Sequence, residues 1–114
     1  MAVINKVDSI EKLGALFERS KVEPVVLFKH SNSCGISAHI LETVQGIDGE
    51  LNVIVIQDNR DISNEAAART GYNHQSPQAF VLVNGKPVYH ATHYGIDPNA
   101  IAKAVSASTV IFNG

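Results

Sequence analysis

The stretch Val25-Val-Leu-Phe-Lys-His-Ser-Asn-Ser-Cys-Gly-Ile-Ser37 contains the features that decide the fold. It opens with a continuous apolar run over 25–28, which is typical of a strand buried on both faces of a sheet. Turn-forming residues follow at 31–33, and apolar residues then recur at helical spacing until about Gly46. The pattern predicts a strand, a short turn capped by Asn32 or Ser33, and a helix with Cys34 in its first turn.

The segments before and after this stretch alternate between strand-like and helix-like patterns, which predicts an α/β fold. Upstream, we expect a short strand at Val3-Ile4 and a helix over about residues 9–20, with Asp8 and Glu11 as a capping box. Downstream, the apolar run at 51–56 predicts a second buried strand. A short helix capped by Asp61 or Ser63 and stopped by Gly71 should follow it.

The last third of the chain predicts a hairpin and a final helix. Asn84-Gly85 lies between the apolar runs 79–83 and 88–92, and this dipeptide is the strongest short hairpin signal. Asp97-Pro98 is typical of a helix start. The apolar end at 110–112 is too short to assign.

Composition limits the classes of function. The chain has 114 residues, which predicts one domain spanning residues 1–114. A formal net charge of -2 argues against a nucleic-acid partner, because such proteins are usually clearly basic. No apolar stretch approaches the roughly 20 residues that span a bilayer, and no secretory signal is visible. We therefore expect a cytoplasmic protein with no membrane partner.

Cys34 is the single cysteine, so the chain cannot form a disulfide within itself. Free N–H groups and the helix dipole at a helix start favour a negative charge, and they therefore favour the nucleophilic thiolate. The hydroxyl of Ser37, about one turn on, is a candidate donor to that thiolate. A lone cysteine is most often a buried structural residue, but the position after a strand and a turn favours a reactive one.

Two neighbours of the thiol are candidate site residues. His30 should lie at the end of the strand, where it is either an imidazolium that stabilises the thiolate or a solvated side chain. Lys29 is either solvated or attracts an anionic thiol ligand. The five histidines match no zinc signature, so we expect no metal site.

The arrangement resembles the thioredoxin superfamily over nearly the whole chain. Cys34-Gly-Ile-Ser37 matches the family's Cys-x-x-Cys motif with serine in place of the second cysteine. Ser76-Pro77 falls just before the hairpin, where the family has a cis-proline. The resemblance implies a thioredoxin-like fold, with a central mixed sheet of four or five strands flanked by helices. It also implies that Pro77 packs beside Cys34 and that the Ser76 backbone pairs with a disulfide substrate.

The stretch from Phe28 to Ser37 is similar to the Lys-His-Ser-x-x-Cys-Pro-Ile-Ser block of YtxJ-type monothiol bacilliredoxins. Ser76-Pro-Gln78 and Val88-Tyr-His-Ala-Thr-His93 resemble later segments of that family. The resemblance implies that Cys34 removes a low-molecular-weight thiol, bacillithiol, from S-thiolated client proteins. Bacillithiol is then a co-substrate, and no cofactor is tightly bound. Ser33, Gly35 and Ile36 complete the active-site motif, with Gly35 where the family usually has proline.

Two alternatives stay open. Cys34-Gly-Ile-Ser37 is also close to the Cys-Gly-Phe-Ser signature of monothiol glutaredoxins, which bind a [2Fe–2S] cluster together with glutathione. Against this, the segment Thr92-His-Tyr-Gly-Ile-Asp97 lacks the Gly-Gly pair with which those proteins grip glutathione. The third possibility is a non-catalytic interaction domain that kept the fold.

Overall fold

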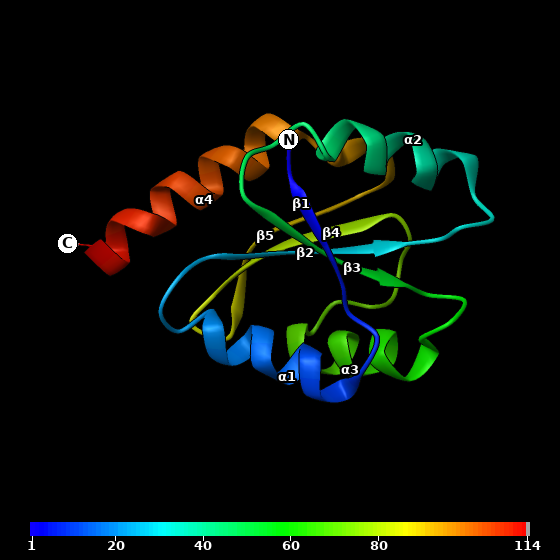
Figure 1. Ribbon diagram of the computed structural model, residues 1–114, viewed down its shortest axis with the longest axis horizontal. Helices are drawn as coiled ribbons and strands as arrows, with labels where there is room; N and C mark the ends of the chain where they lie inside the picture. Colours follow the sequence, from blue (N-terminus) through cyan, green and yellow to red (C-terminus); the bar gives the residue numbers. More distant parts are fainter. Residues whose placement is uncertain (114) are drawn as a thin grey trace.

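The computed structural model describes residues 1–113 of the chain. Strands and helices follow one another in the predicted order (Figure 1). The elements are β1 (Val3–Lys6), α1 (Ile10–Arg19), β2 (Val25–His30), α2 (Gly35–Val44), β3 (Glu50–Val55), α3 (Arg60–Thr70), β4 (Gln78–Val83), β5 (Lys86–Thr92), the 3₁₀ helix η1 (His93–Gly95) and α4 (Pro98–Asn113).

The strands form one mixed five-stranded sheet in the order β1-β3-β2-β4-β5. Strands β1, β3 and β2 run parallel, and β4 and β5 continue the sheet antiparallel. Strand β2 is central, with Phe28 paired to Val53 on one side and to Ala79 on the other. The expected α/β fold with a central mixed sheet of four or five strands is confirmed.

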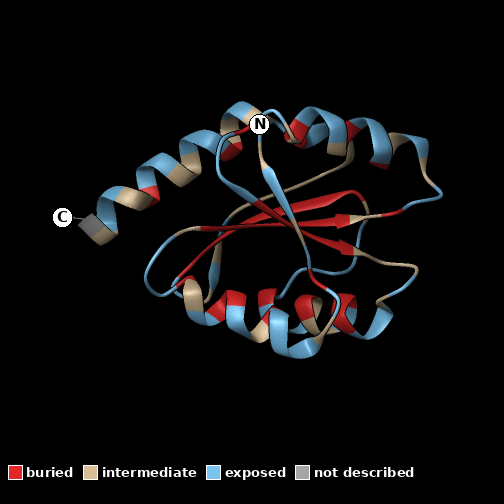
Figure 2. Ribbon diagram, viewed as in Figure 1, coloured by how far each residue is buried: buried red, intermediate tan, exposed pale blue. Residues whose placement is uncertain are grey.

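Helices cover both faces of the sheet. Helices α1 and α3 lie on one face, and α2 and α4 on the other (Figure 1). Side chains alternate along β2, so that Val25 and Leu27 join the core under α1 and α3, whereas Val26 and Phe28 join the core under α2 and α4. The buried residues accordingly lie along the sheet and the inner sides of the helices (Figure 2). The apolar run at 25–28 thus forms a strand buried on both faces, as predicted.

Helix starts differ from the predictions at α1 and α3, and the unassigned end of the chain is helical. Ser9, and not Asp8, caps α1: its hydroxyl accepts from the Lys12 N–H at 3.1 Å, while Asp8 pairs with the Lys12 ammonium at 2.7 Å. Helix α3 begins at Arg60 after Asn59, ahead of the predicted caps. The apolar end at 110–112 continues α4. These differences arise because several polar residues in a row can each cap a helix, and tertiary packing selects among them.

The β4–β5 hairpin forms at the predicted turn. Asn84 and Gly85 have φ angles of 54° and 78°, the left-handed conformations that a two-residue hairpin turn requires and that favour Asn-Gly. Strand β5 lies at the edge of the sheet, where proline is tolerated, because an edge strand can present a residue without an N–H to solvent and not to a neighbouring strand. The register shifts between Val81 and Leu82.

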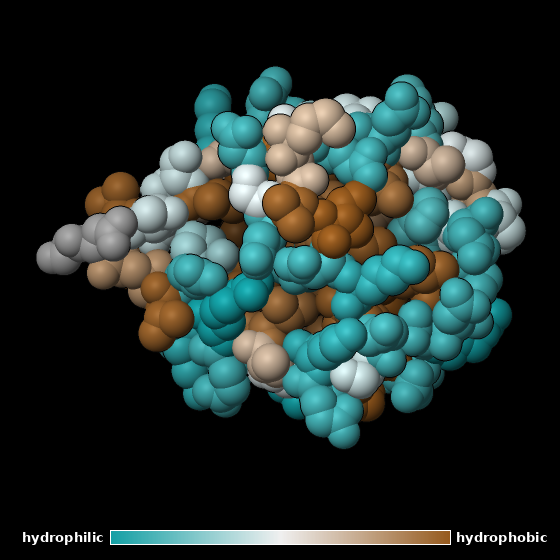
Figure 3. All heavy atoms as spheres, in the orientation of Figure 1, coloured by the Kyte–Doolittle hydropathy of each residue, from teal (hydrophilic) through white to brown (hydrophobic). Residues whose placement is uncertain are grey.

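The surface is mainly polar, with several exposed apolar side chains, among them residues of β1 and of the end of α4. Val3 on the edge strand β1 is 62% exposed, and Val110 and Ile111 near the end of α4 are 68% and 69% exposed. Figure 3 shows apolar atoms beside the C-terminal end of the chain. No helix within residues 1–113 has the length and apolar character needed to cross a membrane.

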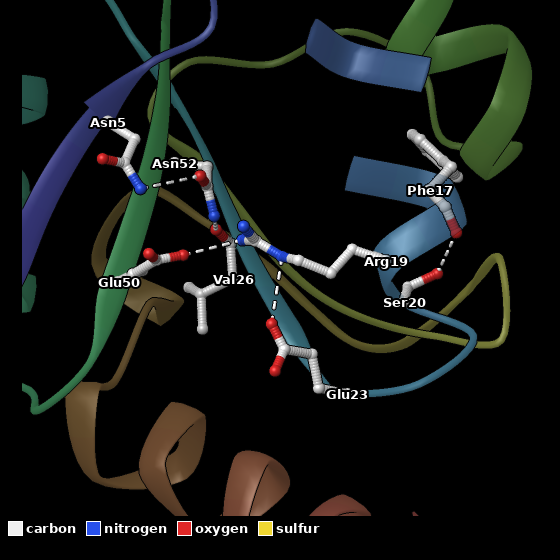
Figure 4. Close-up of polar contacts among 8 residues, drawn as sticks. All are labelled: Asn5, Phe17, Arg19, Ser20, Glu23, Val26, Glu50 and Asn52. Carbon is white, nitrogen blue, oxygen red and sulfur yellow. Dashed lines mark hydrogen bonds and ion pairs between the residues drawn. The ribbon is translucent and has the colours of Figure 1, made fainter. Parts of the chain in front are cut away.

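Polar contacts tie the sheet to α1 at the end remote from Cys34 (Figure 4). The buried Asn52 side chain donates to the Val26 carbonyl at 3.0 Å, and Arg19 bridges Glu23 and Glu50 at 3.1 and 2.8 Å. Ser20 is fully buried, and its hydroxyl donates to the Phe17 carbonyl at 2.5 Å.

Ser20 also holds the hairpin turn against α1. Its hydroxyl accepts from the Gly85 N–H at 2.8 Å, and its carbonyl accepts from the Asn84 N–H at 2.6 Å. The residue therefore joins the end of α1 to the β4–β5 turn.

Replacing Ser20 by alanine should destabilise the protein, because the Gly85 N–H loses its acceptor. A buried donor left without a partner costs about 1–3 kcal/mol. Urea unfolding of Ser20→Ala should show this loss in the free energy of unfolding. The matched control is Ser106→Ala on the exposed side of α4, where we expect a change within about 0.5 kcal/mol. Equal stability of the two variants would contradict the role of Ser20.

Candidate active site

Cys34 is the N-cap of α2 and is partly exposed. Its backbone is extended, with φ -116° and ψ 118°, and its side chain makes no capping hydrogen bond. The helix therefore begins one residue later than predicted, and neither Asn32 nor Ser33 is the cap. An N-cap side chain lies next to the free N–H groups of the first turn, which normally donate to a capping oxygen. A thiolate at Cys34 would stand where that oxygen normally does.

Gln57 holds the loop before Cys34. Its amide nitrogen donates to the hydroxyls of Ser31 and Ser33 at 2.7 and 3.0 Å. Its amide oxygen accepts from the Asn32 N–H at 3.1 Å. The predicted motif residue Ser33 is thus fixed from the end of β3. Gln57 is not among the predicted site residues, although a polar residue directly after a buried strand is a usable signal.

His30 and Ser37 contact one another beside this loop. The His30 Nδ1 and the Ser37 Oγ lie 2.8 Å apart, and Ser37 also accepts from the Ser31 N–H at 3.0 Å. Among residues 1–113, no hydrogen bond ends on the Cys34 sulfur, so the predicted Ser37–thiolate bond stays a prediction. Burial lowers the pKa of His30 below its ordinary value, so the neutral imidazole prevails near pH 7. The imidazolium, one of the two expectations, is therefore not the main form of His30, and stabilisation of the Cys34 thiolate by His30 stays a prediction.

Lys29 is not solvated, contrary to one of the two expectations. It is fully buried on the α3 side of β2, and its ammonium donates to the Ser63 carbonyl at 2.9 Å. The reason is strand alternation, which turns Lys29 away from the face where His30 meets Ser37. Burial lowers the pKa of Lys29 to about 8, so the side chain is still mainly charged at neutral pH. A ligand cannot touch this ammonium directly, and attraction of an anion by Lys29 stays a prediction.

Ser76 and Pro77 lie at the same end of the sheet as the Cys34 loop. Lys29 of β2 pairs with Gln78 of β4, which places Pro77 beside the end of β2. The Ser76–Pro77 bond is cis, as the resemblance implied. Within residues 1–113, the backbone of Ser76 makes no hydrogen bond, which leaves it available to a substrate. Packing of Pro77 on Cys34 stays a prediction.

Two further segments fix the loop that carries Pro77. The buried Gln78 side chain donates to the Asn73 carbonyl at 3.1 Å and accepts from the Gln75 N–H at 3.3 Å. On the other side, the His93 N–H donates to the Pro77 carbonyl at 3.0 Å. His93 starts η1 with φ 51°, directly after the end of β5.

Gly35 and Ile36 are the first two residues of α2. An added Cβ at Gly35 would meet no atom within 4 Å. The N–H at the first position of a helix has no acceptor within the helix, so proline, which lacks an N–H, suits this position well. The extended backbone of Cys34 is also the one that a following proline favours.

The candidate site contains no preformed metal-binding cluster. In the described part of the chain, no three His, Cys, Asp or Glu side chains lie close enough to hold an ion. Of the histidines, His30 bonds Ser37, His74 bonds Ser63 and His90 lies 2.9 Å from the Gln78 amide.

The model of the family described as monothiol bacilliredoxin BrxC matches residues 5–101 of this sequence. The chain belongs to the monothiol bacilliredoxin family. One solved structure similar to this bacilliredoxin is described as a candidate oxidoreductase with a thioredoxin fold. It is 33% identical, covers 90% of this chain and 93% of its own, and has a TM-score of 0.82. The family and this neighbour support thiol redox chemistry at the single cysteine.

Thioredoxins themselves share the fold of this bacilliredoxin. Malassezia sympodialis thioredoxin is 13% identical, with a TM-score of 0.71 over 96% of this chain and 93% of its own. Thioredoxin from Trypanosoma brucei brucei is 15% identical, with a TM-score of 0.71 over 92% of this chain and 89% of its own. The predicted thioredoxin-like fold is therefore confirmed.

Replacing Gly35 by proline should stabilise this bacilliredoxin by about 0.4–1 kcal/mol, because it restricts the unfolded chain at a compatible position. Reactivity of Cys34 toward a thiol reagent should change little, because the N–H groups of Ile36 and Ser37 are kept. The matched control is Ala38→Pro, which removes the Ala38 N–H bond to the Cys34 carbonyl and should cost about 3 kcal/mol. A destabilised Gly35→Pro variant in urea unfolding would contradict the prediction.

Replacing Lys29 by methionine should remove a pH dependence of stability. The folded pKa is about 8 and the ordinary value is 10.5. Between these values the unfolded chain binds more protons than the folded one, so wild-type stability rises with pH. The rise should approach about 3 kcal/mol across this window.

The measurement is the free energy of unfolding of wild type minus that of Lys29→Met, followed from pH 7 to 10.5. The difference should move in favour of the wild type as pH rises. Lys103→Met, at an exposed position of α4, should show no such trend. A pH-independent difference would mean that burial does not lower the pKa of Lys29.

Proposed function

We propose that this protein is a thiol–disulfide oxidoreductase of the YtxJ type, which removes bacillithiol from S-thiolated client proteins in the cytoplasm. The observation that carries the proposal is Cys34, a lone, partly exposed cysteine at the N-cap of α2. Family membership supports the coarse activity, and the sequence block from Phe28 to Ser37 supports the choice of bacillithiol.

The first step is an exchange at the small thiol. The Cys34 thiolate attacks the bacillithiol sulfur of the mixed disulfide, a new S–S bond forms, and the S–S bond to the client breaks. The client cysteine leaves as a thiolate and takes a proton from solvent. Cys34 then carries bacillithiol, and the Ser76 backbone beside Pro77 is the surface along which the disulfide would lie.

The second step needs a second molecule of the small thiol. Ser37 occupies the place of a resolving cysteine, and its buried hydroxyl is held by His30 and Ser31. The chain therefore has no thiol of its own to release the adduct. A second bacillithiol thiolate attacks the bound one, which forms bacillithiol disulfide and restores the Cys34 thiolate. Overall, the client cysteine is reduced to its thiol, one free bacillithiol is consumed, and it leaves joined to the removed bacillithiol as bacillithiol disulfide.

Wild-type protein should release bacillithiol from a model client and gain the mass of one bacillithiol on Cys34. Cys34→Ser should do neither, because the serine hydroxyl is not a nucleophile at neutral pH. Intact-mass spectrometry and a client-thiol assay measure both outcomes. Ser106→Ala, remote on α4, is the control and should match wild type.

Three results would count against the proposal. Release of bacillithiol by Cys34→Ser would place the chemistry elsewhere. Preference for a glutathione adduct, with visible absorbance after anaerobic iron and sulfide reconstitution, would favour the glutaredoxin-like alternative. Absence of any adduct on wild type would favour a non-catalytic interaction domain.

A further inference from the structure

A small hollow of about 80 Å³ lies on the α3 side of the same sheet edge as Cys34. It is formed by the residue after β3, the first turns of α3 and the loop that leads to Pro77. Its lining residues are Ile56, Arg60, Ser63, Asn64 and His74. The proposed exchange reaction assigns no role to these residues.

The hollow adjoins both segments of the candidate active site. Ile56 donates its N–H to the His30 carbonyl at 2.9 Å, and the next residue, Gln57, holds the loop before Cys34. On the other side, His74 lies two residues before Ser76. A small molecule joined through its sulfur to Cys34 and lying along Ser76 would reach this hollow by extending over the end of β2 to its α3 side.

The charges around the hollow are positive. Arg60 lines it, and the buried Lys29 lies behind it, bonded to the Ser63 carbonyl at 2.9 Å; His74 also lines it, as a neutral ring. The Ser63 hydroxyl contacts the His74 Nδ1 at 2.9 Å. Burial is the main cause that lowers the pKa of His74, and the positive charges of Lys29 and Arg60 lower it further. Both charges therefore act electrostatically on the His74 ring. The nearby acids Asp58 and Asp61 do not line the hollow.

These cations lack counterions within the described residues. Arg19 and Arg69 pair with glutamates, and Lys12 and Lys21 with acids one turn away. Neither Lys29 nor Arg60 forms an ion pair among residues 1–113. A buried ammonium that is not paired is costly, and an anion placed in the hollow would offset that cost.

We propose that this hollow binds a carboxylate of the low-molecular-weight thiol that exchanges at Cys34. The inference rests on the proposed function and adds a subsite to it. Arg60 supplies guanidinium N–H donors, Asn64 an amide, and His74 its Nε2, since the Nδ1 is occupied by Ser63. Lys29 adds positive charge from beneath without touching the ligand. Thiols that carry carboxylates, such as bacillithiol with its malate group, are then preferred over uncharged ones.

The test compares two adducts on one client. The same model protein is loaded with bacillithiol or with uncharged 2-mercaptoethanol, and the second-order rate constant of release is measured for each. Arg60→Gln should lower the rate constant for the bacillithiol adduct by about tenfold, the effect of one lost charge-assisted hydrogen bond. The rate constant for the 2-mercaptoethanol adduct should stay unchanged.

Lys86→Gln is the matched control, because it removes one positive charge from the hairpin turn at the far end of the sheet. It should leave both rate constants unchanged. Equal losses on both adducts in Arg60→Gln would overturn the subsite, since they would indicate a contact with the client or a general effect. No loss on either adduct would overturn it as well.

Binding is also measured without chemistry. In Cys34→Ser, titration with bacillithiol disulfide should shift the NMR resonances of His74 and Asn64, and Arg60→Gln in the same background should weaken that binding about tenfold. Resonances of the hollow that do not move would overturn the subsite. If wild type exchanges neither adduct but these resonances shift, the proposed function fails while the subsite stands.

Discussion

Strand β2 is the constraint on which the rest of the structure depends. It is hydrogen-bonded to a parallel strand on one side and to an antiparallel strand on the other, with helices over both faces. Burial on both faces permits only one register, because a slip of one residue would exchange the two sets of side chains. The same register ends the strand at His30 and delivers Cys34 to the edge where Ser76 and Pro77 lie.

Successive side chains of β2 point to opposite faces of the sheet, so adjacent residues have different contacts. His30 faces the α2 side and meets Ser37, which stands where a second cysteine would be in a dithiol relative. Lys29 faces the α3 side and meets Ser63. Two adjacent residues of β2 thus face opposite sides of the sheet: His30 faces the side of Ser37, and the buried charge of Lys29 lies beneath the hollow on the α3 side. The Gln57 side chain closes this arrangement by fixing the loop between His30 and Cys34.

The buried Lys29 stands out in energetic terms. A charged side chain with one carbonyl partner and no carboxylate destabilises the isolated fold, and perturbed ionisable groups of this kind cluster at functional sites. At the other end of the sheet, the Ser20 hydroxyl has a carbonyl partner and the Arg19 guanidinium is ion-paired to two carboxylates, although its buried Nε makes no hydrogen bond within the described residues (Figure 4). The uncompensated charge therefore lies at the end of the molecule where chemistry is expected.

Local sequence patterns determined the order of the elements, the buried central strand, the Asn84-Gly85 turn and the position of Cys34 between strand and helix. Each of these follows from the periodicity or turn chemistry of a few adjacent residues. Tertiary structure alone decided which polar residue caps α1, that His30 meets Ser37, that Gln57 clamps the Cys34 loop and that Lys29 is buried beside Ser63. The Gln57 and Lys29 contacts join residues far apart in the chain, while the α1 cap and the His30–Ser37 contact are local choices among several polar residues. In each case the geometry depends on which elements become neighbours and which face each side chain takes.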